Sequence, residues 1–123
     1  MSVEKAKVFM SAMENRDLKT ANSCLDVDTL MTFPGGNKLE NLNEVIDWSR
    51  SRYKFVNKTI DSVEEILNKD LTVIYIIGTL HGEWLDGKSF KDIRFIDRFV
   101  FRDARIVDLK VWNDLAEFRG RER

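Results

Sequence analysis

The first third of the chain carries apolar residues at the spacing of helices. Apolar positions three and four residues apart predict an amphipathic helix that ends near residue 15. The apolar residues that recur along it are Ala6, Phe9, Met10 and Met13. Asp17 is placed to cap a second, short helix, and residues 29–33 then predict a short strand that ends in a turn at Pro34.

A third helix is expected after Asn41, because Asn41 and Glu44 stand at the spacing of a capping box. Apolar residues continue at helical spacing from there as far as residue 56. The inward stripe consists of Leu42, Val45, Ile46, Ser49, Tyr53 and Val56. Trp48 and Arg52 flank this stripe.

From residue 59 onward the pattern changes to the two-residue alternation of strands. Alternation and turn signals predict four strands, at residues 59–67, 71–85, 90–102 and 105–114. Asp86-Gly87 predicts a two-residue hairpin turn, because both central residues of a primed turn need positive φ. Helices followed by a meander of strands indicate an α+β fold.

The hairpin turn determines which residues share a face of the sheet. With two residues in the turn, Ile76 lies opposite Asp97 and Gly78 lies opposite Phe95, on an inner face of apolar residues. The missing side chain of Gly78 leaves either room for the ring of Phe95 or an opening above the sheet. His81 lies on the outer face in this register, and only a β-bulge would turn it inward as a candidate general base.

Asp97 is the acid that this register places inside the fold. Arg94 and Arg98 lie on the opposite face of the same strand and cannot be its partners. Apolar surroundings disfavour the charged form of an acid, which makes Asp97 a candidate proton carrier or ligand anchor. The alternative is a structural role, in which Asp97 only accepts hydrogen bonds from a Trp, a Tyr or backbone amides.

Composition narrows the function classes. Twenty basic and 21 acidic residues give a net charge of −1, which argues against nucleic-acid binding through bulk electrostatics. A single Cys24 and a single His81 make a metal centre improbable, and Cys24 has no neighbouring base to activate it as a nucleophile. We expect no membrane segment and a reducing, cytoplasmic location.

The chain resembles the nuclear transport factor two-like superfamily in the order of its elements and in three segments. These are Phe33-Pro34-Gly35-Gly36 and the closing segments Phe-Arg-Asp-Ala-Arg-Ile and Val-Trp-Asn-Asp. That superfamily includes ketosteroid isomerases, epoxide hydrolases and SnoaL-type polyketide cyclases. The resemblance implies a curved sheet wrapped around the N-terminal helices as a cone with a pocket, and a homodimer through the outer sheet face. The family's catalytic acids do not carry over, because Phe33 stands where the isomerases have their base and Val111 where the hydrolases have an Asp.

Further residues are candidates for the wall of the pocket. An indole, a guanidinium and a phenol at Trp48, Arg52 and Tyr53 could bind an aromatic acid or a carbonyl compound. The alternative is that both aromatic rings belong to the core and Arg52 reaches solvent. The predicted ligand-binding residues are Trp48, Arg52, Tyr53, Gly78, Trp84 and Phe95. Trp112 is expected on the outer face, at the dimer interface.

The sequence thus predicts one cone-shaped domain over residues 1–118, with a charged tail at 119–123. We expect it to bind a small, largely apolar organic molecule, without cofactor or metal. Two functions remain open. One is an isomerase, cyclase or dehydratase that uses Asp97, and the other is a non-catalytic ligand-binding or dimerisation module.

Overall fold

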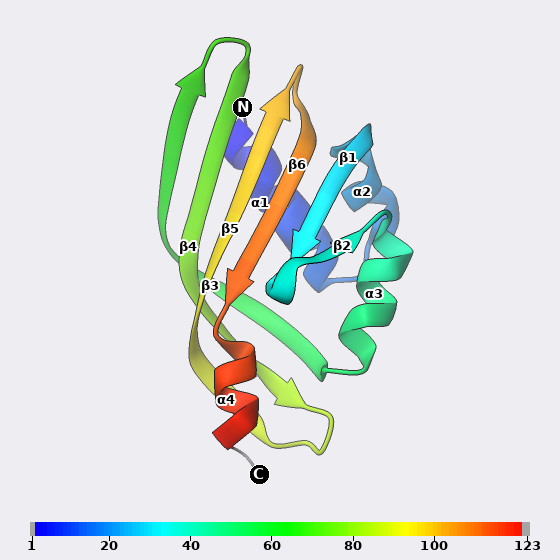
Figure 1. Ribbon diagram of the computed structural model, residues 1–123, viewed down its shortest axis with the longest axis vertical. Helices are drawn as coiled ribbons and strands as arrows, with labels where there is room; N and C mark the ends of the chain where they lie inside the picture. Colours follow the sequence, from blue (N-terminus) through cyan, green and yellow to red (C-terminus); the bar gives the residue numbers. More distant parts are fainter. Residues whose placement is uncertain (1, 122–123) are drawn as a thin grey trace.

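The computed structural model describes residues 2–121, which form a curved sheet with helices packed against it (Figure 1). Helix α1 runs across one face of the sheet, and α2 and α3 lie near the edge of the sheet that β1 and β2 form (Figure 1). The helical elements are α1 (Ser2–Glu14), α2 (Leu18–Ser23), the 3-10 turn η1 (Pro34–Gly36), α3 (Leu42–Arg50) and α4 (Leu115–Arg121). The strands are β1 (Leu25–Phe33), β2 (Asn37–Leu39), β3 (Tyr53–Asn68), β4 (Leu71–Trp84), β5 (Ser89–Arg102) and β6 (Arg105–Asn113).

The six strands form one mixed sheet in the order β2-β1-β6-β5-β4-β3. Strands β3 to β6 are a meander of antiparallel hairpins, whereas β1 pairs with β6 in parallel. This α+β arrangement, with a curved sheet around N-terminal helices, confirms the fold class predicted from the sequence.

The core lies between α1 and the inner faces of β4 and β5. Phe9 of α1 meets Phe99 of β5 edge-to-face, with 6.0 Å between the ring centroids. Phe99 is fully buried, and so are its neighbours Ile74 and Ile76 on β4. The apolar residues that alternate along β4 and β5 therefore pack against the apolar face of α1. This packing holds α1 against the sheet.

The expected third helix was too long, because α3 ends at Arg50 and β3 begins at Tyr53. Tyr53 and Val56 are three residues apart, which suggested helical spacing. A β-bulge between Tyr53 and Phe55 explains the spacing, since it breaks the two-residue alternation. Both side chains can then face the interior although they belong to one strand.

The register predicted for β4 and β5 is confirmed, although the turn that connects them is not the predicted one. Ile76 pairs with Asp97 and Gly78 pairs with Phe95. The hairpin closes where the Trp84 N–H donates to the Lys88 carbonyl at 2.9 Å, which leaves three residues in the loop instead of two. A β-bulge, in which His81 faces two residues of β5, compensates for the extra loop residue. From Leu80 onward, away from the turn, the pairs are therefore those predicted. His81 itself remains exposed on the outside.

Three smaller features were absent from the predicted elements. Strand β1 begins at Leu25 rather than at residue 29, and the turn η1 leads into the short strand β2. Helix α4 includes residues 119–121 of the segment predicted as a tail. Among the described residues, no helix has the length and apolar character needed to cross a membrane.

Candidate functional site

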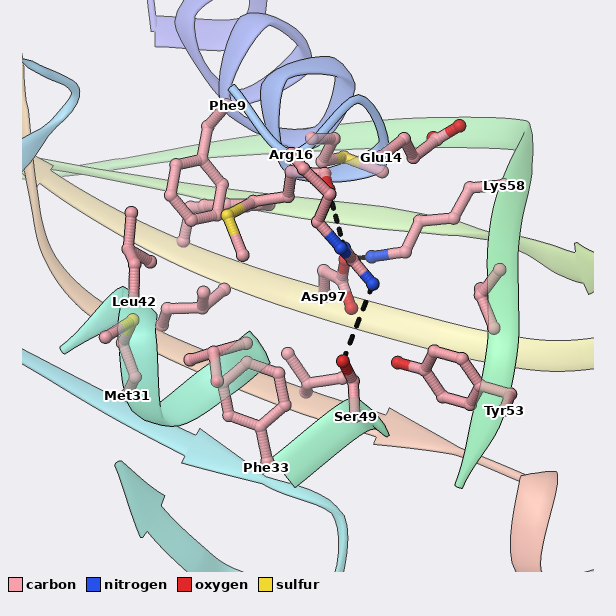
Figure 2. A pocket seen from close by; sticks show the side chains of 17 residues that line it. Phe9, Glu14, Arg16, Met31, Phe33, Leu42, Ser49, Tyr53, Lys58 and Asp97 are labelled. Atoms are coloured by element: carbon pink, nitrogen blue, oxygen red, sulfur yellow. Dashed lines mark hydrogen bonds and ion pairs between the residues drawn. The ribbon is translucent and has the colours of Figure 1, made fainter. Parts of the chain in front are cut away.

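The interior pocket lies between α1, α3 and the inner face of the sheet (Figure 2). Its volume is about 100 Å³. Apolar side chains make most of the wall, and the main ones are Phe9, Met10, Met31, Phe33, Leu42, Phe99 and Val111. An engineered apolar cavity of about 150 Å³ admits benzene, so a pocket of this volume limits the enclosed part of a ligand to about one small ring.

Asp97 lies on the floor of this pocket with its side chain almost fully buried. Its Oδ2 is ion-paired with Lys58 Nζ, which comes from β3 on the far side of β4. Its Oδ1 is buried and has no hydrogen-bond partner among the described residues. A buried oxygen without a donor is costly, so Asp97 offers a free acceptor to whatever enters the pocket.

Lys58 reaches Asp97 from the inner face of β3. Its side chain keeps 22% of its surface exposed, and its Nζ lies 5.0 Å from the centroid of the Phe95 ring. The ammonium group therefore neutralises the carboxylate, while part of the Lys58 side chain remains exposed to solvent. Lys58 thus holds the Asp97 side chain in place and leaves one carboxylate oxygen available.

Tyr53 and Ser49 bring two hydroxyl groups to the same part of the pocket (Figure 2). Burial raises the pKa of the Tyr53 phenol above its ordinary value of 10.0, and the guanidinium groups of Arg16 and Arg52 only partly offset this effect. Tyr53 is therefore a neutral phenol at neutral pH and can donate a hydrogen bond. Ser49 Oγ donates to the Ile46 carbonyl at 2.8 Å.

Arg16 lies at the end of α1, next to the polar part of the pocket (Figure 2). It has a left-handed backbone with φ of 57°, and its Nη1 donates to the Met13 carbonyl at 2.7 Å. Its Nη2 lies 3.5 Å from Ser49 Oγ on α3. Arg16 therefore spans the pocket edge from α1 to α3, although the residue is exposed to solvent.

Only two of the predicted site residues line this pocket, namely Asp97 and Tyr53. Gly78 and Phe95 instead border an open groove with Trp112 of the outer face. A Cβ at Gly78 would lie 1.9 Å from the Thr59 carbonyl oxygen, so Gly78 permits a close approach of β3 and makes no opening into the pocket.

The other three predicted residues, Trp48, Arg52 and Trp84, line a second, smaller cavity of about 30 Å³. Arg52 follows the end of α3 and does not lie on the helix as predicted, and its guanidinium carbon is 4.0 Å from the centroid of the Trp48 ring. Trp84 packs against Phe90 with centroids 4.4 Å apart. Tyr53 lines both cavities.

Lys58 and Arg16 were not predicted as site residues. For Lys58 a signal was present in the sequence, because Val56, Lys58 and Ile60 alternate, and a charge between two apolar positions indicates an inward cation. No comparable local signal marks Arg16. Cys24 is a free, buried thiol. The described residues contain no group of three or more His, Cys, Asp or Glu placed to hold a metal ion.

Comparison with known proteins gives a result at the level of structure alone. No family model and no curated protein matches the sequence. Among solved structures, an NTF2-like protein of unknown function from Burkholderia pseudomallei superposes with a TM-score of 0.77 at 21% identity, over 95% of this chain and 93% of that one. The chain has the nuclear transport factor two-like fold. The fold expected from the sequence motifs is thereby confirmed.

Two further structures with this fold have names that point to chemistry. TerC, crystallised with polyporic acid, has a TM-score of 0.77 at 19% identity, over 97% of this chain and 95% of that one. IdmH from Streptomyces antibioticus, a proposed polyketide cyclase, has a TM-score of 0.71 at 14% identity, over 99% and 98% of the two chains. At such identities the likeness is one of fold, so function has to be argued from the site.

Proposed function

We propose that this protein binds a small, largely apolar organic molecule in the interior pocket and moves a proton on it with Asp97. The observation that carries the proposal is the buried Asp97 Oδ1, which faces a pocket with apolar walls and has no hydrogen-bond partner among the described residues. Such an oxygen can accept a hydrogen bond from a ligand or remove a proton from it.

The neighbouring groups have complementary roles. The neutral phenol of Tyr53 donates a hydrogen bond to a ligand oxygen, where negative charge develops when a proton leaves the adjacent carbon. Lys58 holds the carboxylate through Oδ2. The apolar walls orient the ring and exclude water. This set suits an isomerase, cyclase or dehydratase that works on a carbonyl compound or a phenol without a cofactor.

The likeness to IdmH and TerC supports a small-molecule function, because both share this fold over nearly their whole length. A second candidate is a non-catalytic ligand-binding or dimerisation module. The ion pair of Lys58 with Asp97 favours that candidate, since a buried carboxylate held by an ion pair also suits a purely structural role.

Two probes separate these functions. Binding of p-cresol, measured by changes in the protein NMR spectrum, tests for the pocket ligand. Exchange of the α-hydrogens of cyclohexanone in D₂O, followed by NMR, tests for proton transfer. We expect the wild-type protein to bind p-cresol and to accelerate exchange, and Asp97→Asn to lose the acceleration while it still binds p-cresol.

The matched control is Asp108→Asn, which removes a carboxylate paired with Arg98 at 3.2 Å outside the pocket. This variant should retain both properties. Binding without any acceleration of exchange in the wild type would identify a ligand-binding module, and absence of p-cresol binding would overturn the proposal as a whole.

A further inference from the structure

Two residues that line the small cavity next to Tyr53 each carry a buried N–H donor without an acceptor. The Nε1 of Trp84 and the Nε of Arg52 are both buried and have no hydrogen-bond partner among the described residues. Both residues line the same cavity. Trp84 keeps only 6% of its surface exposed. Because nearly all buried polar groups in proteins are paired, two unpaired donors around one space indicate a missing acceptor.

The charge around this cavity is positive. The central carbon of the Arg52 guanidinium lies over the Trp48 ring, 4.0 Å from the ring centroid. None of the ion pairs among the described residues includes Arg52. A guanidinium that is partly desolvated by an indole and lacks a counter-charge favours an anionic acceptor over a neutral one.

The size of the cavity limits the anion. At about 30 Å³ it has room for one small group, and its walls include Pro34, Leu115 and Ala116, none of which has a charged side chain. A guanidinium presents its N–H groups in one plane, which matches the two oxygens of a carboxylate. A phosphate or sulfate is larger and would need additional donors.

We infer that this cavity is a carboxylate-binding site in which Arg52 and Trp84 donate to one carboxylate group. The site is distinct from the Asp97 pocket, and Tyr53 is the one lining residue that the two share. It does not depend on proton transfer by Asp97. A free organic acid bound here would contact the back of Tyr53 and would place its remaining atoms toward the gap between α3 and α4.

The test uses sodium formate as the probe and the indole N–H resonance of Trp84 as the readout. That resonance is assigned by its loss in Trp84→Phe. At constant ionic strength kept with sodium chloride, we expect formate to shift the Trp84 signal in a saturable way and to leave the signal of Trp112, on the outer face, unchanged. Formate should also raise the melting temperature of the wild type and not that of Trp84→Phe.

Arg52→Gln should weaken formate binding by about tenfold or more. The matched control is Arg50→Gln. It removes the same charge two residues before Arg52, at a side chain that is 75% exposed. It should leave the affinity unchanged. The inference would be overturned by a Trp84 signal that does not respond to formate, by an equal response in Arg52→Gln, or by magnetisation transfer showing that the N–H is held by a bound water that formate does not displace.

Discussion

Lys58 Nζ and Asp97 Oδ2 form an ion pair inside the cone although the two residues lie 39 positions apart and on strands separated by β4. Asp97 is almost fully buried, and Lys58 keeps 22% of its side chain exposed. This pairing changes what a stability measurement can show. Asp97→Asn is expected to lose about 1–3 kcal/mol because a charged partner is lost, whether or not the acid is catalytic. A comparison of the stabilities of wild type and Asp97→Asn therefore does not separate a catalytic role of Asp97 from a structural one.

Lys58→Met should destabilise the protein by about 3 kcal/mol, at the lower end of the range for breaking a buried pair, because Lys58 is partly solvated. Urea denaturation at neutral pH measures this. Lys54→Met, at an exposed position of the same strand, is the control and should change stability by less than about 0.5 kcal/mol. Equal effects of the two substitutions would show that the ion pair does not stabilise the fold.

Tyr53→Phe should make stability less sensitive to alkaline pH. Burial raises the pKa of Tyr53 above 10.0, so the folded state holds this proton more tightly than the unfolded state does. The associated stability is fully present below the unfolded pKa of about 10 and is lost as pH rises through the folded pKa.

Melting temperatures recorded across that alkaline range in wild type and Tyr53→Phe should show a steeper decline in the wild type. Tyr75→Phe removes a hydroxyl from the outer face of β4 and should decline as steeply as the wild type. A wild-type decline no steeper than that of Tyr53→Phe would contradict the assignment to Tyr53.

Trp112→Glu should dissociate a homodimer without unfolding the domain. The side chains of Trp112 and Ile96 lie opposite each other on β6 and β5 and are 50% and 38% exposed. With the half-buried Tyr75 and Ile77 they belong to the outer face predicted as the dimer interface, and an apolar patch of this kind favours association. Val100, also expected on this face, is only 6% exposed and adds almost nothing to the patch.

Sedimentation at micromolar concentration tests the dimer. Leu67→Glu, at a residue that is 74% exposed near the far end of the β3-β4 hairpin, is the control and should leave the assembly intact. A wild-type protein that sediments only as a monomer would reject the predicted interface.

Trp48→Ala should reduce stability more than it reduces binding of p-cresol. The Trp48 ring packs on Phe33 with 5.3 Å between centroids and does not line the interior pocket. We expect a loss of about 2 kcal/mol and less than about a threefold change in affinity. This expectation reverses the one drawn from the sequence, where Trp48 was a predicted pocket wall. A large loss of affinity at unchanged stability would restore the earlier interpretation.

The sequence by itself determined the fold class, the inner face of the β4-β5 hairpin and the burial of Asp97. These follow from local rules, because alternation along one strand decides the face of each side chain whatever the rest of the chain does. The pairing of Ile76 with Asp97 was right even though the turn has one residue more than predicted, since the bulge opposite His81 compensates for it. Apolar residues sort with apolar residues only in that register, which explains why the prediction survived the error in the turn.

Only the tertiary structure decided which groups surround Asp97. Lys58 meets it because the sheet curves and brings the inner face of β3 across β4, and Arg16 approaches because a left-handed residue ends α1 beside α3. The separation of Trp48, Arg52 and Trp84 from the main pocket has the same origin, since α3 ends at Arg50 and the bulge after Tyr53 turns the chain. Bulges and strand curvature arise from packing between distant segments, and the local pattern of residues does not encode them.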